Sequence, residues 1–204
     1  MLFLWEGKVA PISTTKDMRI IARQLGRRPR PGTDVCRRCR YGFPQVVISP
    51  PVVRDGCRWD IFPTVYWLTC PHLIAAIGRL EAQGWIGRYE KRLAEEPHFA
   101  EALAASHAAA AADRLRRVPA EWRDALERDY PRLWQSLAET GVAGIRSRSG
   151  VKCLHAHYAD YVGRGDNPIG RAVEAQLLQA GVPLDGTDEC WRLCTLDEEA
   201  RSDG

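Results

Sequence analysis

The sequence predicts an α+β protein that is predominantly helical, a helical bundle with a small antiparallel β element in its N-terminal third. Two observations lead to this prediction. From residue 71 onward, apolar residues recur at three- and four-residue spacing, as they do along one face of a helix. Before that point, residues 45–53 and 63–69 are rich in β-branched and aromatic residues, which is typical of short strands.

The elements of the first third follow from local signals. Residues 14–26 are expected to form a helix, with a hydroxyl residue as its cap and Gly26 as its stop. Residues 36–44 and 54–60 are predicted to be a loop and a turn, because glycine and proline interrupt regular structure. Prolines also restrict residues 45–53 to an edge strand or to two short strands.

The remaining two thirds of the chain are predicted to be helical. Pro71 suits a helix start, because the first turn of a helix has no use for the N–H that proline lacks. Pro131 is expected to kink or break a helix, and Asn167 to cap one. The expected helices are residues 71–83, 85–96, 97–118, 119–140, 151–163 and 166–181, with 141–150 as a flexible connection.

Length and composition limit the classes of protein. The 204 residues suffice for one packed domain, predicted at residues 1–183 and followed by an acidic tail at 184–204. No run approaches the roughly 18 apolar residues of a membrane span, so no membrane partner is expected. The stretch 1–13 has no basic leader before its short apolar run, which predicts a cytoplasmic location without a secretion signal.

Positive charge is concentrated in one segment. The net charge is only +3, which provides no overall attraction to nucleic acid. Between Arg19 and Arg40, however, eight arginines accompany a single acid, Asp34. These arginines could contact RNA phosphates, or they could form a solvated, salt-bridged face, and the second interpretation is favoured.

Seven cysteines are many for a reducing compartment, and an odd number cannot pair completely. Three occupy positions that favour thiolates: Cys39 among arginines, Cys70 at a helix start, and Cys153 in the first turn of another helix. Soft metals need such ligands. The three are predicted to converge on one centre, a [4Fe–4S] cluster with an open iron or alternatively zinc. Redox chemistry by Cys36 and Cys39 would also be compatible with the sequence, as would simple burial of the thiols.

Polar residues near the third cysteine are candidates for proton transfer. Lys152 and His155 flank it within two residues. A hydrogen-bonding role for His155 is favoured over a ligand role, because two residues on a continuous helix face different ways. His157 lies four residues on and shares the face of the thiol. His107 is expected to be a packed histidine.

The chain resembles a bacterial family common in actinobacteria, the domain of unknown function 501, in four ordered stretches: "RQLGRRPR", "CRYGFPQVV", "FPTVYWLTCPHLIAAIGRLEAQG" and "VKCLHAHYADYVGRGDNPIG". The resemblance spans about residues 14–180 and is most specific in "YWLTCP", "KCLH" and "NPIG". It implies that Cys39, Cys70 and Cys153 are the family's three cysteines. The others lie outside its pattern: Cys36, Cys57, Cys190 and Cys194.

Two departures from the family pattern affect the expected site. The turn "DGCRWDIFPT" is longer than the family's and carries Cys57. Where the family often has a further histidine, this chain has Asp160, which could act as a base or as a hydrogen-bond partner.

Together these observations predict a cytoplasmic metalloprotein with a three-cysteine centre. Its unidentified small-molecule substrate would bind the open iron in non-redox or sulfur-handling chemistry, with Lys152, His155 and Asp160 nearby for proton transfer. The alternative is a binding module for RNA or protein that contains a structural zinc or no metal.

Overall fold

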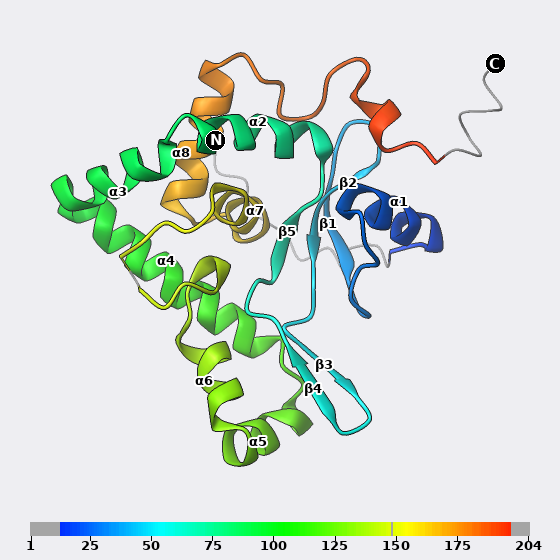
Figure 1. Ribbon diagram of the computed structural model, residues 1–204, viewed down its shortest axis with the longest axis vertical. Coiled ribbons are helices and arrows are strands. Elements are labelled where there is room, and N and C mark those ends of the chain that lie inside the picture. The colour runs from blue at the N-terminus through cyan, green and yellow to red at the C-terminus, as the bar shows by residue number, and fades with distance from the viewer. Residues whose placement is uncertain (1–12, 148, 197–204) are drawn as a thin grey trace.

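The computed structural model describes residues 13–147 and 149–196. As predicted, the described part is a mainly helical α+β fold, in which helices surround a small antiparallel sheet near the N-terminal end of the chain (Figure 1). The predicted N-terminal stretch 1–12 and the last part of the predicted tail, residues 197–204, lie outside the described residues.

The boundaries of the elements agree closely with the predicted helices. The helices are α1 (Thr15–Leu25), α2 (Pro71–Ala82), α3 (Trp85–Glu95), α4 (Pro97–Arg116), α5 (Ala120–Asp129), α6 (Pro131–Glu139), α7 (Leu154–Arg164) and α8 (Pro168–Gln179), with 3-10 turns η1 (Val142–Gly144) and η2 (Cys190–Leu193). The strands are β1 (Asp34–Arg38), β2 (Pro44–Ile48), β3 (Val52–Asp55), β4 (Arg58–Ile61) and β5 (Tyr66–Leu68). Within the described ranges, no helix has the length and apolar character needed to cross a membrane.

The main sheet has the order β1–β2–β5, and both neighbours of β2 run antiparallel to it. Successive side chains of a strand point to opposite faces. Val46 therefore packs in the cluster that contains α7, whereas Val47 packs with Ile21 of α1. Figure 1 shows the resulting layers, with α1 on one side of the sheet and α7 on the other.

Three sequence predictions for this region need correction. Residues 45–53 do form two short strands, but the first of them, β2, is central in its sheet and not an edge strand. The predicted turn at residues 54–60 is mostly strand, because β3 and β4 form a hairpin around Gly56, whose φ of 55° allows the tight turn. The predicted loop at 36–44 begins inside β1, which includes Cys36.

Helix α7 lies at the centre of the molecule and touches the sheet, α2 and α8 (Figure 1). Its close packing depends on small residues. A methyl group at Gly163 would overlap the ring of Tyr66, and one at Gly170 of α8 would overlap the carbonyl oxygen of His157. Only glycine permits these approaches, so α7 is held firmly between β5 and α8.

The described part of the predicted tail, residues 184–196, contacts the body of the protein. Gln45 donates a side-chain hydrogen bond of 2.8 Å to the carbonyl oxygen of Leu184. The hydroxyl of Tyr41 donates to the carbonyl oxygen of Thr187 at 2.9 Å. Cys194 at the end of η2 is only 5% exposed. The tail thus covers the end of the sheet at which β2 begins.

Candidate metal centre

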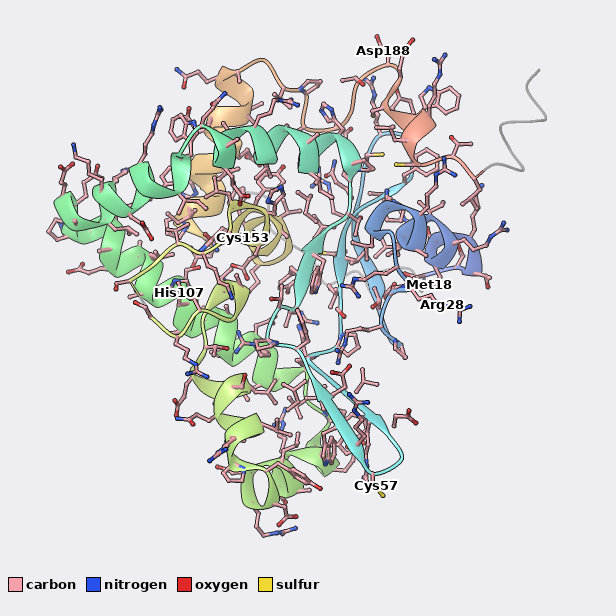
Figure 2. All side chains as sticks on the ribbon, viewed as in Figure 1. Met18, Arg28, Cys57, His107, Cys153 and Asp188 are labelled. Atoms are coloured by element: carbon pink, nitrogen blue, oxygen red, sulfur yellow. The ribbon has the colours of Figure 1, made fainter. Side chains whose placement is uncertain are left out.

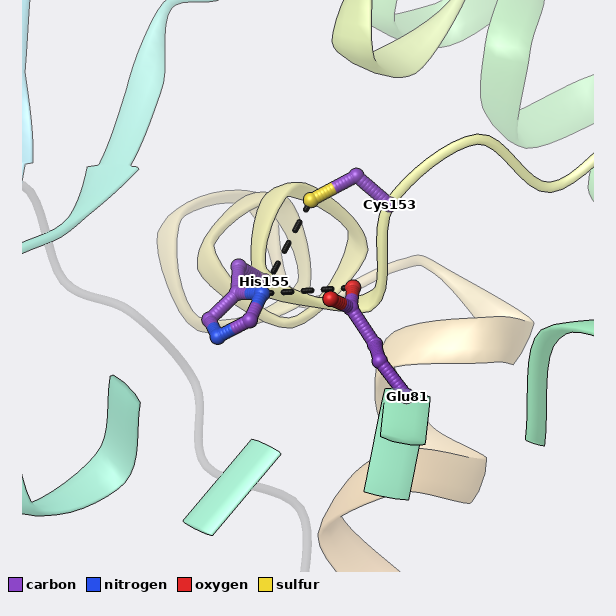
Figure 3. A group of neighbouring side chains, drawn as sticks. All are labelled: Glu81, Cys153 and His155. Carbon is purple, nitrogen blue, oxygen red and sulfur yellow. Dashed lines mark hydrogen bonds and ion pairs between the residues drawn. The ribbon is translucent and has the colours of Figure 1, made fainter. Parts of the chain in front are cut away.

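Glu81, Cys153 and His155 bring three different donor atoms together (Figure 3). The Nδ1 atom of His155 lies 3.8 Å from the sulfur of Cys153 and 3.2 Å from Oε1 of Glu81. The three donor atoms all lie within 4.8 Å of one another. Within residues 13–147 and 149–196, no other group of three or more His, Cys, Asp or Glu side chains meets that spacing.

The start of α7 explains how two neighbouring residues reach the same point. Cys153 is the N-cap and has extended backbone angles, φ −157° and ψ 121°, so it lies one position before the helix and not in its first turn as predicted. Its thiol makes no capping hydrogen bond. The carboxylate of Glu81 takes that place, because its Oε1 accepts the backbone N–H of Leu154 at 2.7 Å.

The imidazole of His155 is held from both sides. Its Nε2 atom donates to the carbonyl oxygen of Ile74 on α2 at 3.0 Å, which leaves Nδ1 facing the thiol and the carboxylate. Burial lowers the pKa of this half-buried ring, but hydrogen bonds to Cys153 and Ile74, together with the charge of Glu81, outweigh it and raise the pKa to about 9.

The donor set fits a single zinc-type ion. Tetrahedral bonds of about 2.0 to 2.3 Å hold the donor atoms of a zinc site about 3.3 to 3.8 Å apart, and the two separations at His155, 3.2 and 3.8 Å, are close to this range. The bond from Nε2 to the Ile74 carbonyl is the orienting contact that metal-binding histidines usually make. An ion held here would have three protein ligands and a fourth position for water or substrate.

A family profile described as protein of unknown function (DUF501) matches residues 35–175. The chain belongs to this family. The DUF501 match includes Glu81, Cys153 and His155, and it ends before Cys190 and Cys194. Neither a curated protein nor a solved structure matches the chain.

Two predicted catalytic residues of the DUF501 region lie outside this group. The exposed ammonium of Lys152 donates to the carbonyl oxygen of Ala143 at 3.4 Å. Asp160 is buried in an ion pair with Arg164, at 2.5 Å, and accepts a hydrogen bond from the side chain of Asn167. Asp160 therefore belongs to the contact between α7 and α8.

The predicted cysteines of the family pattern are divided between two places. Cys70 is the N-cap of α2, as predicted, and Cys39 lies in the turn between β1 and β2. Glu81 follows Cys70 by eleven residues on α2, about 16 Å along the helix axis. Cys153, in contrast, belongs to the Glu81 group. That all three cysteines share a single iron–sulfur centre stays a prediction. Cys57 is remote, at the tip of the β3–β4 hairpin (Figure 2).

Sequence reasoning missed Glu81 as a site residue. Its partners follow more than seventy residues later in the chain, and its own neighbourhood on α2 shows only an ordinary pattern of apolar and charged residues. The weak signal available was an acid on a helix that begins with one of the family's cysteines.

Within the described part of the chain, three of the eight arginines in the basic segment of the DUF501 protein form ion pairs with acids. Arg38 lies 2.6 Å from Asp17, and Arg30 lies 2.7 Å from Asp60. Arg40 pairs with Asp188 in the tail. These ion pairs support the salt-bridged interpretation of the segment.

Proposed function

We propose that this protein is a metal-dependent enzyme in which Glu81, Cys153 and His155 hold one zinc-type divalent ion. The supporting observation is the convergence of sulfur, nitrogen and oxygen donors from α2 and the start of α7 at zinc-ligand spacing. Three protein ligands with one open position are typical of catalytic zinc, whereas structural zinc has four protein ligands.

The chemistry that such an ion supports is hydrolysis or hydration. A zinc-type ion lowers the pKa of a bound water and polarises a carbonyl or phosphoryl oxygen. The chain's own residues orient the centre: the Ile74 carbonyl fixes the ring of His155, and the Leu154 N–H fixes the carboxylate of Glu81. These two backbone contacts orient two of the three donors before a metal binds.

Metal binding is tested with cobalt, which reports thiolate ligation through an absorption band. The full-length protein should bind one cobalt ion, and Glu81→Gln, Cys153→Ser and His155→Gln should each weaken binding at least tenfold. His98→Gln is the matched control, because the side chain of His98 is fully exposed on α4. Unchanged affinity in His155→Gln would refute the centre.

Catalysis is tested with p-nitrophenyl acetate, an ester that activated water hydrolyses. Zinc-loaded protein should hydrolyse it, chelation should abolish the activity, and added zinc should restore it. Glu81→Gln should retain less than a tenth of the activity. If the metal-free protein is active and Cys153 is rapidly acylated, the centre is instead a thiol nucleophile paired with His155, and the metal proposal fails.

A further inference from the structure

A second group of thiols surrounds the start of β2. The backbone N–H of Cys39 donates to the carbonyl oxygen of Phe43 at 3.0 Å, across the turn that joins β1 to β2. On the other side of β2, the backbone N–H of Cys70 donates to the carbonyl oxygen of Gln45 at 3.3 Å. These two cysteines therefore flank the same three-residue segment, 43–45.

A third cysteine reaches this segment from the tail. The side-chain amide of Gln24 on α1 donates to the carbonyl oxygen of Pro44 at 2.9 Å and to the sulfur of Cys194 at 3.2 Å. Pro44 lies between the two residues that contact Cys39 and Cys70. Cys194 follows η2, and η2 packs on α2, the helix that begins after Cys70. Three segments far apart in sequence thus place cysteines around one end of the sheet.

The thiols of this group influence one another. Cys70 is 6% exposed and Cys194 is 5% exposed. Burial raises the pKa of Cys70 to about 11. The backbone N–H groups at the start of α2 oppose the shift, and charges at Cys194 and Cys39 add to it. Burial, followed by charges at Cys39 and Cys190, also raises the pKa of Cys194. Without a cation beside them, these two buried thiols remain protonated.

We propose that Cys39, Cys70 and Cys194 are the ligands of an iron–sulfur cluster. A single zinc ion would need sulfurs about 3.8 Å apart. Among the described residues, however, only the Glu81 group has three donors within 4.8 Å, so these three sulfurs are spread more widely. A cluster places several iron and sulfide atoms between its cysteines, so its ligands need not approach one another as closely as those of a single ion. As the Fe–S bonds form, each thiol releases one proton to solvent.

The proposed cluster site is separate from the Glu81 centre. A cleft of about 440 Å³ lies between α2 and η2, and Pro71, next to Cys70, and Cys190 are among its lining residues. Three cysteine ligands would leave one iron of a four-iron cluster for an outside ligand. Figure 2 shows Asp188, which is close to η2 in sequence, well apart from Cys153. The inference does not rest on the proposed zinc-type centre.

The test is anaerobic reconstitution of the full-length protein with equal amounts of ferrous and ferric iron and with sulfide. The protein should take up about four iron and four sulfide per chain and absorb near 400 nm. Cys39→Ser, Cys70→Ser and Cys194→Ser should each lower iron uptake at least fivefold. Cys57→Ser is the control and should take up iron and sulfide like the wild type. Cys153→Ser should take up as much sulfide as the wild type, although it loses the cobalt site.

Two outcomes would overturn the assignment. If Cys153→Ser loses the cluster while Cys194→Ser takes up iron fully, the ligands are Cys39, Cys70 and Cys153, the set that the family pattern implies. Absence of iron uptake by the wild type, or uptake of a single iron without sulfide, would exclude a cluster.

A second measurement needs no substitution, which matters because two of the thiols are buried. The wild type is treated with iodoacetamide after mild urea loosening, with and without reconstitution, and labelled cysteines are mapped by mass spectrometry. Reconstitution should reduce labelling of Cys39, Cys70 and Cys194 at least fivefold and leave Cys57 unchanged. Equal labelling in both samples would refute the cluster.

Discussion

His155 and His157 are two residues apart on α7 and have opposite chemistry. The half-buried ring of His155 faces a carboxylate, a thiol and a carbonyl, and its pKa is raised to about 9. The ring of His157 is fully buried. Its Nδ1 is hydrogen-bonded to Oδ1 of Asn167 at 3.1 Å, and among the described residues its Nε2 has no hydrogen-bond partner. Burial lowers the pKa of His157 to about 3, and charges at His107 and Arg164 act in the same direction. About half a turn of helix thus separates a polar site from the core.

The buried His157 predicts how stability depends on pH. Its folded pKa, about 3, lies below the ordinary value of about 6.5, so the unfolded chain binds the proton first as the pH falls. The free energy of unfolding should therefore decrease from about pH 6.5 toward pH 3, by up to about 1.4 kcal/mol per pH unit from this group. His157→Gln should show a smaller slope in urea unfolding between pH 7 and 5. Identical slopes would contradict the prediction.

At the scale of elements, glycines determine how closely the helices pack. The "NPIG" stretch, residues 167–170, has two structural roles. Asn167 caps α8 by accepting the N–H of Gly170 at 3.0 Å, as predicted, and Gly170 itself allows α8 to approach α7. Gly78, in the middle of α2, has open space around the position of a methyl group and has no such role.

Alanine substitutions should distinguish these two glycines. Gly170→Ala places a methyl group against a backbone carbonyl of α7, which forces the helices apart and should lower the free energy of unfolding by about 1 to 3 kcal/mol. Gly78→Ala should be neutral or stabilising by up to about 1 kcal/mol, because alanine favours helix. Urea titrations of both variants provide the measurement. A stable Gly170→Ala protein would show that the helix contact adjusts easily.

Arg114 of α4 joins several elements in the core. Its guanidinium is 1% exposed and donates to carbonyl oxygens of Pro63, Leu137, Thr140 and Gly141. Three of these oxygens lie at the end of α6 or just beyond it, where a helix leaves its carbonyls unpaired and favours a cation. One arginine thus ties α4 to the end of α6 and to the segment before β5.

Replacing this arginine should make the protein less stable to unfolding. Arg114→Met leaves buried carbonyl oxygens without donors and should lower the free energy of unfolding by about 3 kcal/mol or more. Arg114→Lys should recover only part of the loss, since a single ammonium cannot reach all of these oxygens. Arg116→Lys, two residues away and mostly exposed, is the control and should change stability by less than about 0.5 kcal/mol. Similar stability of all variants would contradict the assigned role.

At the scale of the whole molecule, the tail completes the end of the sheet. Residues 184–196 contact α1, β2 and the β1–β2 turn, and Leu184 packs against the main core. A chain that ends at Val182 or Pro183 would leave Gln45 and Gln24 without these partners.

Truncation after Pro183 tests whether the predicted domain boundary is also a folding boundary. Loss of the tail hydrogen bonds and of the buried Cys194 should lower the free energy of unfolding by about 2 kcal/mol. Asp188→Asn removes only an exposed ion pair and should leave the thermal midpoint unchanged within error. If the truncated protein is as stable as the full chain, residues 1–183 are a self-sufficient unit.

Short-range interactions made most of the elements predictable. Thr14 and Gly26 bound α1 through a capping box and a left-handed residue, and Pro131 separates α5 from α6. The β3–β4 hairpin was missed, because its two strands are short and its turn residues dominate the pattern. The central place of β2 could not be foreseen either, since pairing partners are chosen by the packing of distant segments.

The amino-acid order was enough to establish a mainly helical fold and the family, and it identified Cys70 at a helix start, although it placed Cys153 in the first turn of α7 and not at its N-cap. Which side chains meet was settled by the folding of the whole chain. Folding brought Glu81 to His155, drew Cys194 from the predicted tail to the start of β2, and buried Asp160 in an ion pair. Helix caps and prolines act over a few residues, whereas these contacts depend on how α2, α7 and the tail pack over distances that no local pattern encodes.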